Sequence, residues 1–299
     1  MTNPSSTQRL DHHGLALEYR VDPCARPLTP PVLILGGILN TLDSLGQLAT
    51  RVSTYATAVR VAIPGVHTPG VLPAHLDFDF LTDAVRHILH TLDHDRINLQ
   101  GISYGGNLAH HFASRYPEAV ERLMLTGTAD PGGVTLSDPA LWQDLAVLWR
   151  RSPREVFAQE MTELLTGTAT GLPDAALAPT RRMIRIWAGR LTEDILRLGV
   201  DCGLRMQSLT SAPVGVPVLA VTGEHDAWAR PEACRHLVEE WPDARFTTVR
   251  QSDHFLPMTR PAEYAELTRG FFLDEPVDEL PYCTRWELFG HAATGRTLV

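Results

Sequence analysis

The sequence contains no lysine, since all 26 of its basic residues are arginine. A Schiff base, an anchor for pyridoxal phosphate and a Walker-type phosphate loop all need a lysine amine. The composition therefore excludes all three. The net charge of −9 and the isoelectric point near 5.8 argue against nucleic acid as a partner, because phosphate binding depends on clustered cationic side chains.

Cysteines and long hydrophobic runs are also scarce. The four cysteines, Cys24, Cys202, Cys234 and Cys283, have no pair at metal-ligand spacing and are expected to be free thiols in a reducing compartment. No run approaches the roughly 18 consecutive apolar residues of a membrane helix, and residues 1–14 do not have the pattern of a signal peptide. We therefore expect a soluble, cytoplasmic protein with no membrane partner.

One group of histidines has a spacing that deserves comparison with metal sites. His87 and His90 lie about one helical turn apart, and His94 and Asp95 follow. Exposed histidines on a helix account for the same pattern, so we expect neither a metal ion nor a cofactor.

Among the features that are present, the segment from Gly101 to Gly105 reads Gly-Ile-Ser-Tyr-Gly. It directly follows the apolar run 97–99 and directly precedes a helical pattern, which is the setting of a nucleophile elbow. Such a tight strand-to-helix turn holds its serine in a strained conformation, and flanking glycines remove clashing Cβ atoms. Ser103 is therefore the predicted covalent nucleophile.

The partners of this serine are expected further along the chain. A buried-strand pattern at 218–221 is followed by Asp226, and a strand pattern at 245–249 is followed by His254. The order Ser, Asp, His is one that serine hydrolases use. A serine hydroxyl is a weak nucleophile, so His254 is predicted to take its proton and Asp226 to orient the imidazole.

Two other carboxylates compete with Asp226 for this role. Asp130 also follows a predicted strand, the next one along the chain after the strand that leads into Ser103. Asp253 directly precedes His254, and a neighbouring side chain usually points away from the ring. We favour Asp226 and keep Asp130 as the alternative.

The oxyanion that forms during acyl transfer needs preorganised donors. The residue after the nucleophile supplies one through the main-chain amide of Tyr104. A second is expected from the loop after the strand that ends at Leu35, where Gly37 and Ile38 are the candidate amides. Asn40 is close enough in sequence to add a side-chain donor that contacts the substrate.

Strand and helix patterns alternate over the first part of the chain, which predicts a mostly parallel sheet with helices on both faces. After Asp130 the alternation stops, and residues 131–212 are predicted to form a helical lid inserted after the sixth strand. The core then comprises residues 1–130 and 213–273. The remaining residues 274–299 form an apolar tail that docks on its own body or on a second protomer, as in a homodimer; the sequence leaves both open.

The predicted lid is neutral and rich in tryptophan. Residues 131–212 contain nine arginines and nine acidic residues, so the whole excess negative charge lies outside the lid. Trp142, Trp149 and Trp187 either line an apolar, acyl-binding cavity over the nucleophile or only pack the lid helices together. One of these helices is expected to begin at Pro179.

With these residues in view, the chain resembles the α/β-hydrolase fold superfamily over most of its length. Ser103, Asp226 and His254 match the catalytic triad of that family, and Gly36 and Gly37 match its oxyanion loop. A serine at the elbow, in place of the aspartate of epoxide hydrolases and dehalogenases, implies acyl transfer.

Within the superfamily, three segments and the tail look similar to bacterial 3-hydroxyacyl transferases, namely the synthase of the rhamnolipid precursor and the carrier-protein transacylases of polyester synthesis. The segments are 103–106, 223–226 and 254–256. This resemblance implies a thioester on coenzyme A or acyl carrier protein. Three lid arginines would then meet phosphate or an acidic carrier helix, although a solvated helix face is the stronger explanation for them. They are Arg181, Arg182 and Arg185.

Three functions follow from these observations. The leading hypothesis is a serine esterase or thioesterase that acts on an apolar acyl group through an acyl-enzyme. An acyltransferase would use the same intermediate but admit an alcohol or thiol acceptor. The third is a hydrolase-fold protein that binds a ligand without catalysis.

Overall fold

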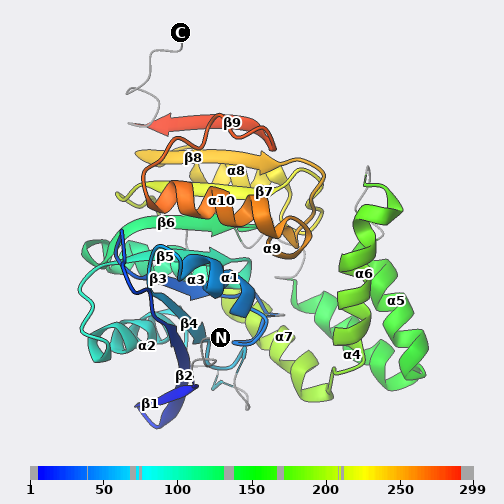
Figure 1. The fold of residues 1–299 in the computed structure, drawn as a ribbon. Helices are drawn as coiled ribbons and strands as arrows, with labels where there is room; N and C mark the ends of the chain where they lie inside the picture. The colour runs from blue at the N-terminus through cyan, green and yellow to red at the C-terminus, as the bar shows by residue number, and fades with distance from the viewer. Residues whose placement is uncertain are drawn as a thin grey trace.

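A computed structural model of the chain describes residues 6–38, 40–67, 72–73, 76–130, 138–166, 172–207, 209 and 212–290. These residues form a nine-stranded sheet with helices on both faces and further helices at one side (Figure 1). In chain order the strands are β1 (Gln8–His12), β2 (Leu15–Asp22), β3 (Val32–Leu35), β4 (Ala58–Ala62), β5 (Ile97–Ile102), β6 (Val120–Thr126), β7 (Val218–Gly223), β8 (Asp243–Val249) and β9 (Cys283–Gly290).

The strand order of the sheet is β1-β2-β4-β3-β5-β6-β7-β8-β9. The strands from β4 to β8 in this order run parallel, whereas β1, β2 and β9 are antiparallel to their neighbours. Every residue of β3, β4, β5 and β7 is buried, as is typical of parallel strands that are covered on both faces. The predicted mostly parallel α/β sheet is thus confirmed.

Two hydrophobic clusters attach helices to opposite faces of the sheet. One contains Phe112 and Leu237 and joins α2, α3 and α8 to the strands, and the other contains Leu48 and Phe271 and joins α1, α9 and α10. The helices that cover the sheet are α1 (Gly46–Val52), α2 (Phe78–Thr91), α3 (Tyr104–Arg115), α8 (Pro231–Val238), α9 (Leu256–Thr259) and α10 (Pro261–Phe272), with a 3-10 turn, η1 (Pro117–Ala119), after α3.

Four helices follow one another between β6 and β7 and extend to the right of the sheet in Figure 1. They are α4 (Pro139–Arg151), α5 (Arg154–Thr166), α6 (Asp174–Ala188) and α7 (Glu193–Met206). The fully buried Trp142 of α4 packs on Gly199 of α7, where a Cβ would come within 2.2 Å of the indole. Here a tryptophan joins two helices of the group.

The helix expected to begin at Pro179 begins earlier, at Asp174, so Pro179 lies inside α6. A proline in a helix interior removes a main-chain donor and is normally disfavoured. Leu177 and Ile184 nevertheless continue one buried stripe across it. Burial of that stripe outweighs the lost hydrogen bond, which the rule for proline alone does not anticipate.

The segment expected to be a tail contains the last strand of the sheet. Strand β9 pairs antiparallel with β8, from Asp243 opposite Gly290 to Val249 opposite Cys283. The sequence left open whether this segment docks on its own body or on a second protomer. Residues 283–290 dock on their own body, at the edge of the sheet.

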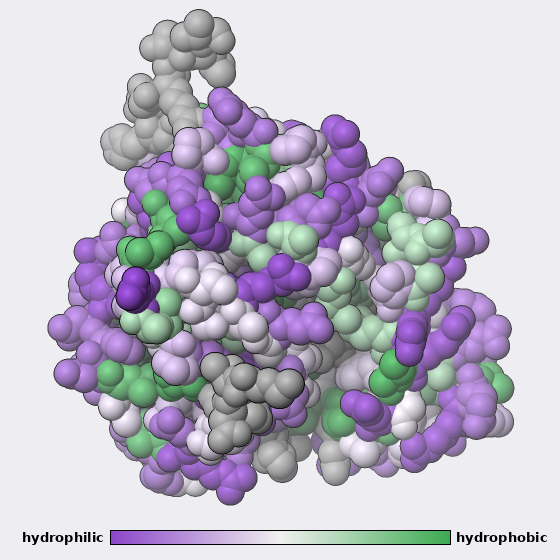
Figure 2. Space-filling view, viewed as in Figure 1, coloured by the Kyte–Doolittle hydropathy of each residue, from purple (hydrophilic) through white to green (hydrophobic). Residues whose placement is uncertain are grey.

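On the face shown in Figure 2, hydrophobic side chains form small, separate patches among hydrophilic ones. Several large apolar side chains that remain exposed belong to the helices between β6 and β7: Val147, Val156, Leu164, Ile186 and Leu204. None of the helices in the described part of the chain has both the length and the apolar character needed to cross a membrane.

Candidate active site

Three candidate residues leave the sheet at the same edge. Ser103 follows β5, Asp226 follows β7 and His254 follows β8, all at the carboxyl ends of parallel strands. Open α/β sheets bind ligands outside this edge. All three residues are largely withdrawn from solvent, with exposures of 9%, 2% and 8% in that order.

Ser103 occupies the turn between β5 and α3 in a strained conformation. Its φ of 53° and ψ of −120° lie in a region that a residue with a side chain rarely adopts. The Ser103 amide donates to the carbonyl of Thr126 at 2.8 Å, which ties the turn to β6. The strained turn that the sequence motif predicts is therefore present.

Glycines make this turn possible because other main-chain segments pass too close for a Cβ atom. A Cβ on Gly101 would lie 2.5 Å from the Cα of Gly106, and one on Gly105 would lie 2.2 Å from the carbonyl oxygen of Leu35. Gly106 is equally constrained, since its Cβ would meet Thr128 Oγ1 at 1.9 Å. The serine is thus held by main-chain packing on both sides.

The His254 ring bridges the other two side chains. Its Nε2 lies 3.1 Å from Ser103 Oγ, and its Nδ1 lies 2.8 Å from Asp226 Oδ2. A carboxylate only accepts, so Nδ1 carries the proton and Nε2 is free to accept from the serine hydroxyl. This is the tautomer that a histidine needs in order to act as a base toward serine.

Asp226 is fixed by donors on both carboxylate oxygens. Its Oδ1 accepts from the amides of Trp228 and Ala229 at 2.9 and 2.8 Å, and its Oδ2 accepts from Thr222 Oγ1 at 2.6 Å as well as from His254. These bonds hold the carboxylate in position against the imidazole.

The two alternative acids do not take this position. Among the described residues, Asp226 supplies the carboxylate that is bonded to His254. Asp253 instead accepts from Thr180 Oγ1 at 2.7 Å and from the Phe255 amide at 2.9 Å. Asp130 lies four residues after the end of the neighbouring strand β6, and the two ring nitrogens of His254 face Ser103 and Asp226.

Gly127 is a site residue that the sequence did not single out. It follows β6, which separates β5 from β7, and its φ is +54°. A Cβ there would lie 3.0 Å from His254 Nδ1 and 3.3 Å from Asp226 Oδ2. Because the imidazole passes over the end of β6, the residue at this point has to be small. The sequence did offer a signal for this residue. Gly127 directly follows the predicted strand that lies, along the chain, between the strands preceding Ser103 and Asp226.

The pKa of the His254 imidazole is raised above its ordinary value. Burial alone lowers this pKa, but the charge of Asp226 and its hydrogen bond to Nδ1 outweigh burial, and Asp253 adds to the upward shift. The Asp226 carboxylate therefore stabilises the imidazolium form.

The loop after β3 differs in part from expectation. The Gly37 amide, expected to point at an oxyanion, donates to Asn40 Oδ1 at 2.8 Å, and Asn40 Nδ2 reaches Ser44 Oγ at 3.4 Å. Both groups are used to close the loop on itself, because a tight turn has to satisfy its own donors. The expectation that Gly37 and the Asn40 side chain face the substrate is therefore not supported.

Gly37 still lies directly against the nucleophile. A Cβ on Gly37 would approach the Ser103 Cβ to 3.1 Å and the Ile102 carbonyl oxygen to 3.3 Å. Tyr104 is buried, with its ring 5.5 Å from that of Phe78, and its amide is the first of helix α3, which has no acceptor within the helix. Ile38 and Tyr104 therefore remain as candidate amide donors.

A small pocket of about 10 Å³ adjoins His254, which is about the room that one water molecule needs. The indole of Trp228 lies 5.0 Å from the imidazole. The pocket is lined by apolar and polar side chains in equal number: Leu165, Leu177, Ala227, Trp228 and Phe255 are apolar, and Thr166, Thr180, His225, Asp253 and His254 are polar.

The three tryptophans expected over the nucleophile do not line this pocket. Trp142 is fully buried, with its ring 6.4 Å from that of Trp187 in an edge-to-face contact. Trp187 and Trp149 are partly buried and pack against the same cluster. In the described residues they pack the helices together, which was the other reading of the sequence.

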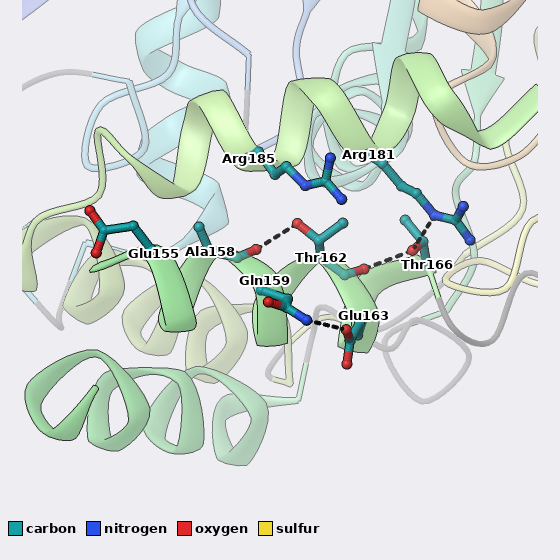
Figure 3. Close-up of a pocket in the computed structure, with 8 residues that line it drawn as sticks. All are labelled: Glu155, Ala158, Gln159, Thr162, Glu163, Thr166, Arg181 and Arg185. Atoms are coloured by element: carbon teal, nitrogen blue, oxygen red, sulfur yellow. Dashed lines mark hydrogen bonds between the residues drawn. The ribbon is translucent and has the colours of Figure 1, made fainter. Parts of the chain in front are cut away.

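A larger groove of about 730 Å³ lies between α5 and α6. Figure 3 shows Arg181 and Arg185 reaching from α6 toward α5, where Thr162 and Thr166 face them. Arg181 is paired with Asp174 at 2.8 Å, and its Nε lies 3.4 Å from Thr166 Oγ1. Arg182 does not line the groove. Thr166 borders both this groove and the pocket beside His254.

Comparison with curated proteins finds a depolymerase and an esterase among the similar sequences. A poly(3-hydroxyalkanoate) depolymerase from Ectopseudomonas oleovorans is 28% identical over 41% of this chain and 42% of its own length. A pimeloyl-[acyl-carrier protein] methyl ester esterase from Neisseria meningitidis is 27% identical over 72% of this chain and 69% of that protein. The chain thus spans less than half of the depolymerase.

Solved structures agree on the fold. MGS-M2, an α/β hydrolase enzyme from a Medee basin deep-sea metagenome library, superposes with a TM-score of 0.75 at 17% identity, covering 91% of this chain and all of the other. The family model of the α/β hydrolase fold matches residues 30–261. The chain belongs to the α/β hydrolase fold family.

Proposed function

We propose that this protein is a serine hydrolase that cleaves an ester or thioester of an apolar acyl group through an acyl-enzyme intermediate. The observation that carries the proposal is the connected set of hydrogen bonds from Ser103 Oγ through His254 to Asp226, at 3.1 and 2.8 Å. A nucleophile, a base and an orienting carboxylate in bonding contact are what acyl transfer to serine requires.

In the first half of the reaction, Ser103 Oγ attacks the carbonyl carbon of the substrate while His254 Nε2 takes its proton. Asp226 stabilises the imidazolium that forms. The tetrahedral intermediate then collapses, the bond to the alcohol or thiol breaks, and His254 returns the proton to that leaving group. The acyl group remains as an ester on Ser103.

In the second half, water replaces the leaving group. His254 removes a proton from the water, whose oxygen attacks the acyl-enzyme carbonyl, and the proton then passes to Ser103 Oγ as the free acid leaves. In both halves, the amides of Ile38 and Tyr104 are the proposed donors to the oxyanion. Since the Gly37 amide is bonded to Asn40, we assign the second donor to Ile38.

The apolar half of the pocket lining supports an apolar acyl group. Leu165, Leu177, Ala227, Trp228 and Phe255 all border the space beside His254. The relatives named as a poly(3-hydroxyalkanoate) depolymerase and as a pimeloyl-[acyl-carrier protein] methyl ester esterase support ester chemistry. Such a conjugate, or a coenzyme A thioester, is a proposed substrate form.

The helices of residues 131–212 are the proposed lid over a core made of residues 1–130 and 213–273. The pocket beside His254 has little free volume, and α5 and α6 form part of its wall through Leu165, Thr166, Leu177 and Thr180. Substrate entry then requires these two helices to move outward, a gating step common among hydrolytic enzymes.

The test is Ser103→Ala, assayed with p-nitrophenyl butyrate and with a fluorophosphonate that labels activated serines. We expect kcat to fall about 10⁴- to 10⁶-fold and the covalent adduct, seen by intact mass, to disappear. Ser114→Ala, on the same helix α3, is the control and should retain both. Wild-type protein that neither hydrolyses the ester nor takes up the label would favour the ligand-binding alternative.

Acyl transfer remains the second candidate because it uses the same intermediate. The observation that favours it is the burial of Ser103 and His254, at 9% and 8% exposure, which restricts access of water. Incubation with an acyl-coenzyme A and candidate alcohols, followed by mass analysis, separates the two. Free acid alone excludes transfer, and a condensed product excludes simple hydrolysis.

A further inference from the structure

One histidine connects the loop after β3 to the loop after β4. His67 Nε2 lies 2.8 Å from the carbonyl oxygen of Gly37, which is 30 positions earlier in the chain. Its Nδ1 lies 3.0 Å from the amide nitrogen of Ile63, and its own amide donates to the Ile63 carbonyl at 2.9 Å. The ring is therefore held at both nitrogens between two main-chain segments.

These contacts determine the tautomer of His67. The Ile63 amide can only donate, so Nδ1 accepts; the Gly37 carbonyl can only accept, so Nε2 carries the proton. Burial lowers the pKa of His67 to about 4, although the bond to Gly37 opposes the shift. The ring is thus a neutral donor to Gly37 at neutral pH.

The Gly37 carbonyl has a direct geometrical link to the proposed oxyanion donor. It belongs to the same peptide group as the Ile38 amide, and the described residues contain no cis peptide bond. In a planar trans peptide the C=O and N–H bonds point in opposite directions. Whatever fixes the direction of the Gly37 carbonyl also fixes the direction of the Ile38 N–H.

Two donors fix that carbonyl. His67 Nε2 is one, and the Asn40 amide, at 2.9 Å, is the other. The Asn40 contact is local, within a four-residue turn, and closes that turn on itself. Of the two contacts, the one from His67 connects the turn to the loop after β4. The carbonyl that it holds belongs to Gly37, which packs against Ser103.

We propose that His67 is a positioning residue for catalysis, which holds the Gly37–Ile38 peptide so that the Ile38 amide faces the oxyanion. This inference rests on the proposed serine hydrolase function. His67 does not touch the substrate; it acts through one peptide group. Loss of His67 should leave substrate binding intact but reduce the stabilisation of the transition state, in which the oxyanion carries its charge.

The experiment compares His67→Phe, which keeps a flat ring without donors, with His67→Gln, whose amide can still donate to the Gly37 carbonyl. With p-nitrophenyl butyrate we expect His67→Phe to lower kcat about 10- to 100-fold and to change KM less than about threefold. His67→Gln should recover part of the loss. Labelling by the fluorophosphonate should slow in parallel, because its phosphoryl oxygen uses the same amides.

His110→Phe is the matched control. His110 is buried, and like His67 it bonds through Nε2 to a main-chain carbonyl, that of Ala212, at 2.7 Å. Its replacement should lower the melting temperature to a similar extent while kcat stays within about twofold of wild type. The control separates a general packing defect from a defect in the oxyanion loop.

The outcomes separate the inference from the function beneath it. A wild-type kcat in folded His67→Phe overturns the positioning role, as does a rise in KM without a fall in kcat. Should His67→Phe fail to fold, His67→Leu, which also lacks a donor, decides by the same criterion. If instead Ser103→Ala hydrolyses the ester at the wild-type rate, the proposed function itself is wrong, whatever the His67 variants do.

Discussion

The sheet and the helices between β6 and β7 fix the candidate site by different means. Around Ser103, main chain packs on main chain, so that a Cβ on Gly105 would lie 2.2 Å from a carbonyl oxygen. The helical segment reaches the site through single side-chain hydrogen bonds: Thr180 Oγ1 to Asp253 at 2.7 Å, and the Trp228 indole to the Leu165 carbonyl at 2.7 Å.

The difference indicates that the two regions have separate roles. Main-chain packing leaves the reacting atoms little freedom, as a site needs when small displacements reduce the rate steeply. The helices are held by their buried apolar side chains together with a few side-chain hydrogen bonds, and these bonds can be broken at modest cost. We therefore expect changes in the sheet loops to affect the chemical step, and changes in the helices to affect access and stability.

After Ser103→Ala, the largest effect is expected for Asp226→Asn. The amide cannot hold the His254 tautomer that leaves Nε2 free, so kcat should fall about 10⁴-fold with little change in KM. Steady-state kinetics measure this, and circular dichroism should show an unchanged fold. Asp130→Asn is the control, since Asp130 follows β6, the strand next to the one that precedes Asp226. A loss confined to the Asp130 variant would reassign the acid.

An effect of about tenfold per pH unit is expected below the pKa of His254. The reaction needs the neutral imidazole, and that pKa is raised above 6.5, so kcat/KM should fall as the pH drops through a midpoint above this value. In a variant without the Asp226 charge the midpoint should move down. The pH profile of residual activity tests both, and a wild-type midpoint below 6.5 would contradict the raised pKa.

The smallest effect is expected for Thr180→Val, which removes the bond from α6 to Asp253. A buried carboxylate oxygen without its donor costs about 1–3 kcal/mol, so the melting temperature should fall. We expect kcat for p-nitrophenyl butyrate to change only a few-fold. Thr180→Ser keeps the hydroxyl and serves as the control. A hundredfold loss of kcat in Thr180→Val alone would abolish the distinction between the two regions.

The three residues that meet at the sheet edge were predictable because each follows a recognisable strand. The motif around Ser103 carries its own local signal, and parallel strands necessarily end at one edge, which brings Asp226 and His254 near it. The strand order then decides between Asp226 and Asp130, and that order is a property of long-range pairing.

Other contacts have no local signal. His67 reaches Gly37 across two adjacent strands, and its neighbours in sequence give no indication of this contact. Strand β9 was missed because edge strands carry a weak, half-buried pattern. Pro179 reads as a helix start, and only the tertiary burial of Leu177 and Ile184 reveals that the helix continues through it.

Thr166 belongs to the wall of the pocket at the imidazole and also to the wall of the outer groove. One side chain therefore stands where the inner and outer spaces approach each other, although it is none of the three that carry the proton. A larger or smaller side chain at this position would change the size of both spaces without altering the residues that break the bond. The range of molecules admitted can therefore diverge among related proteins while the reaction itself is conserved.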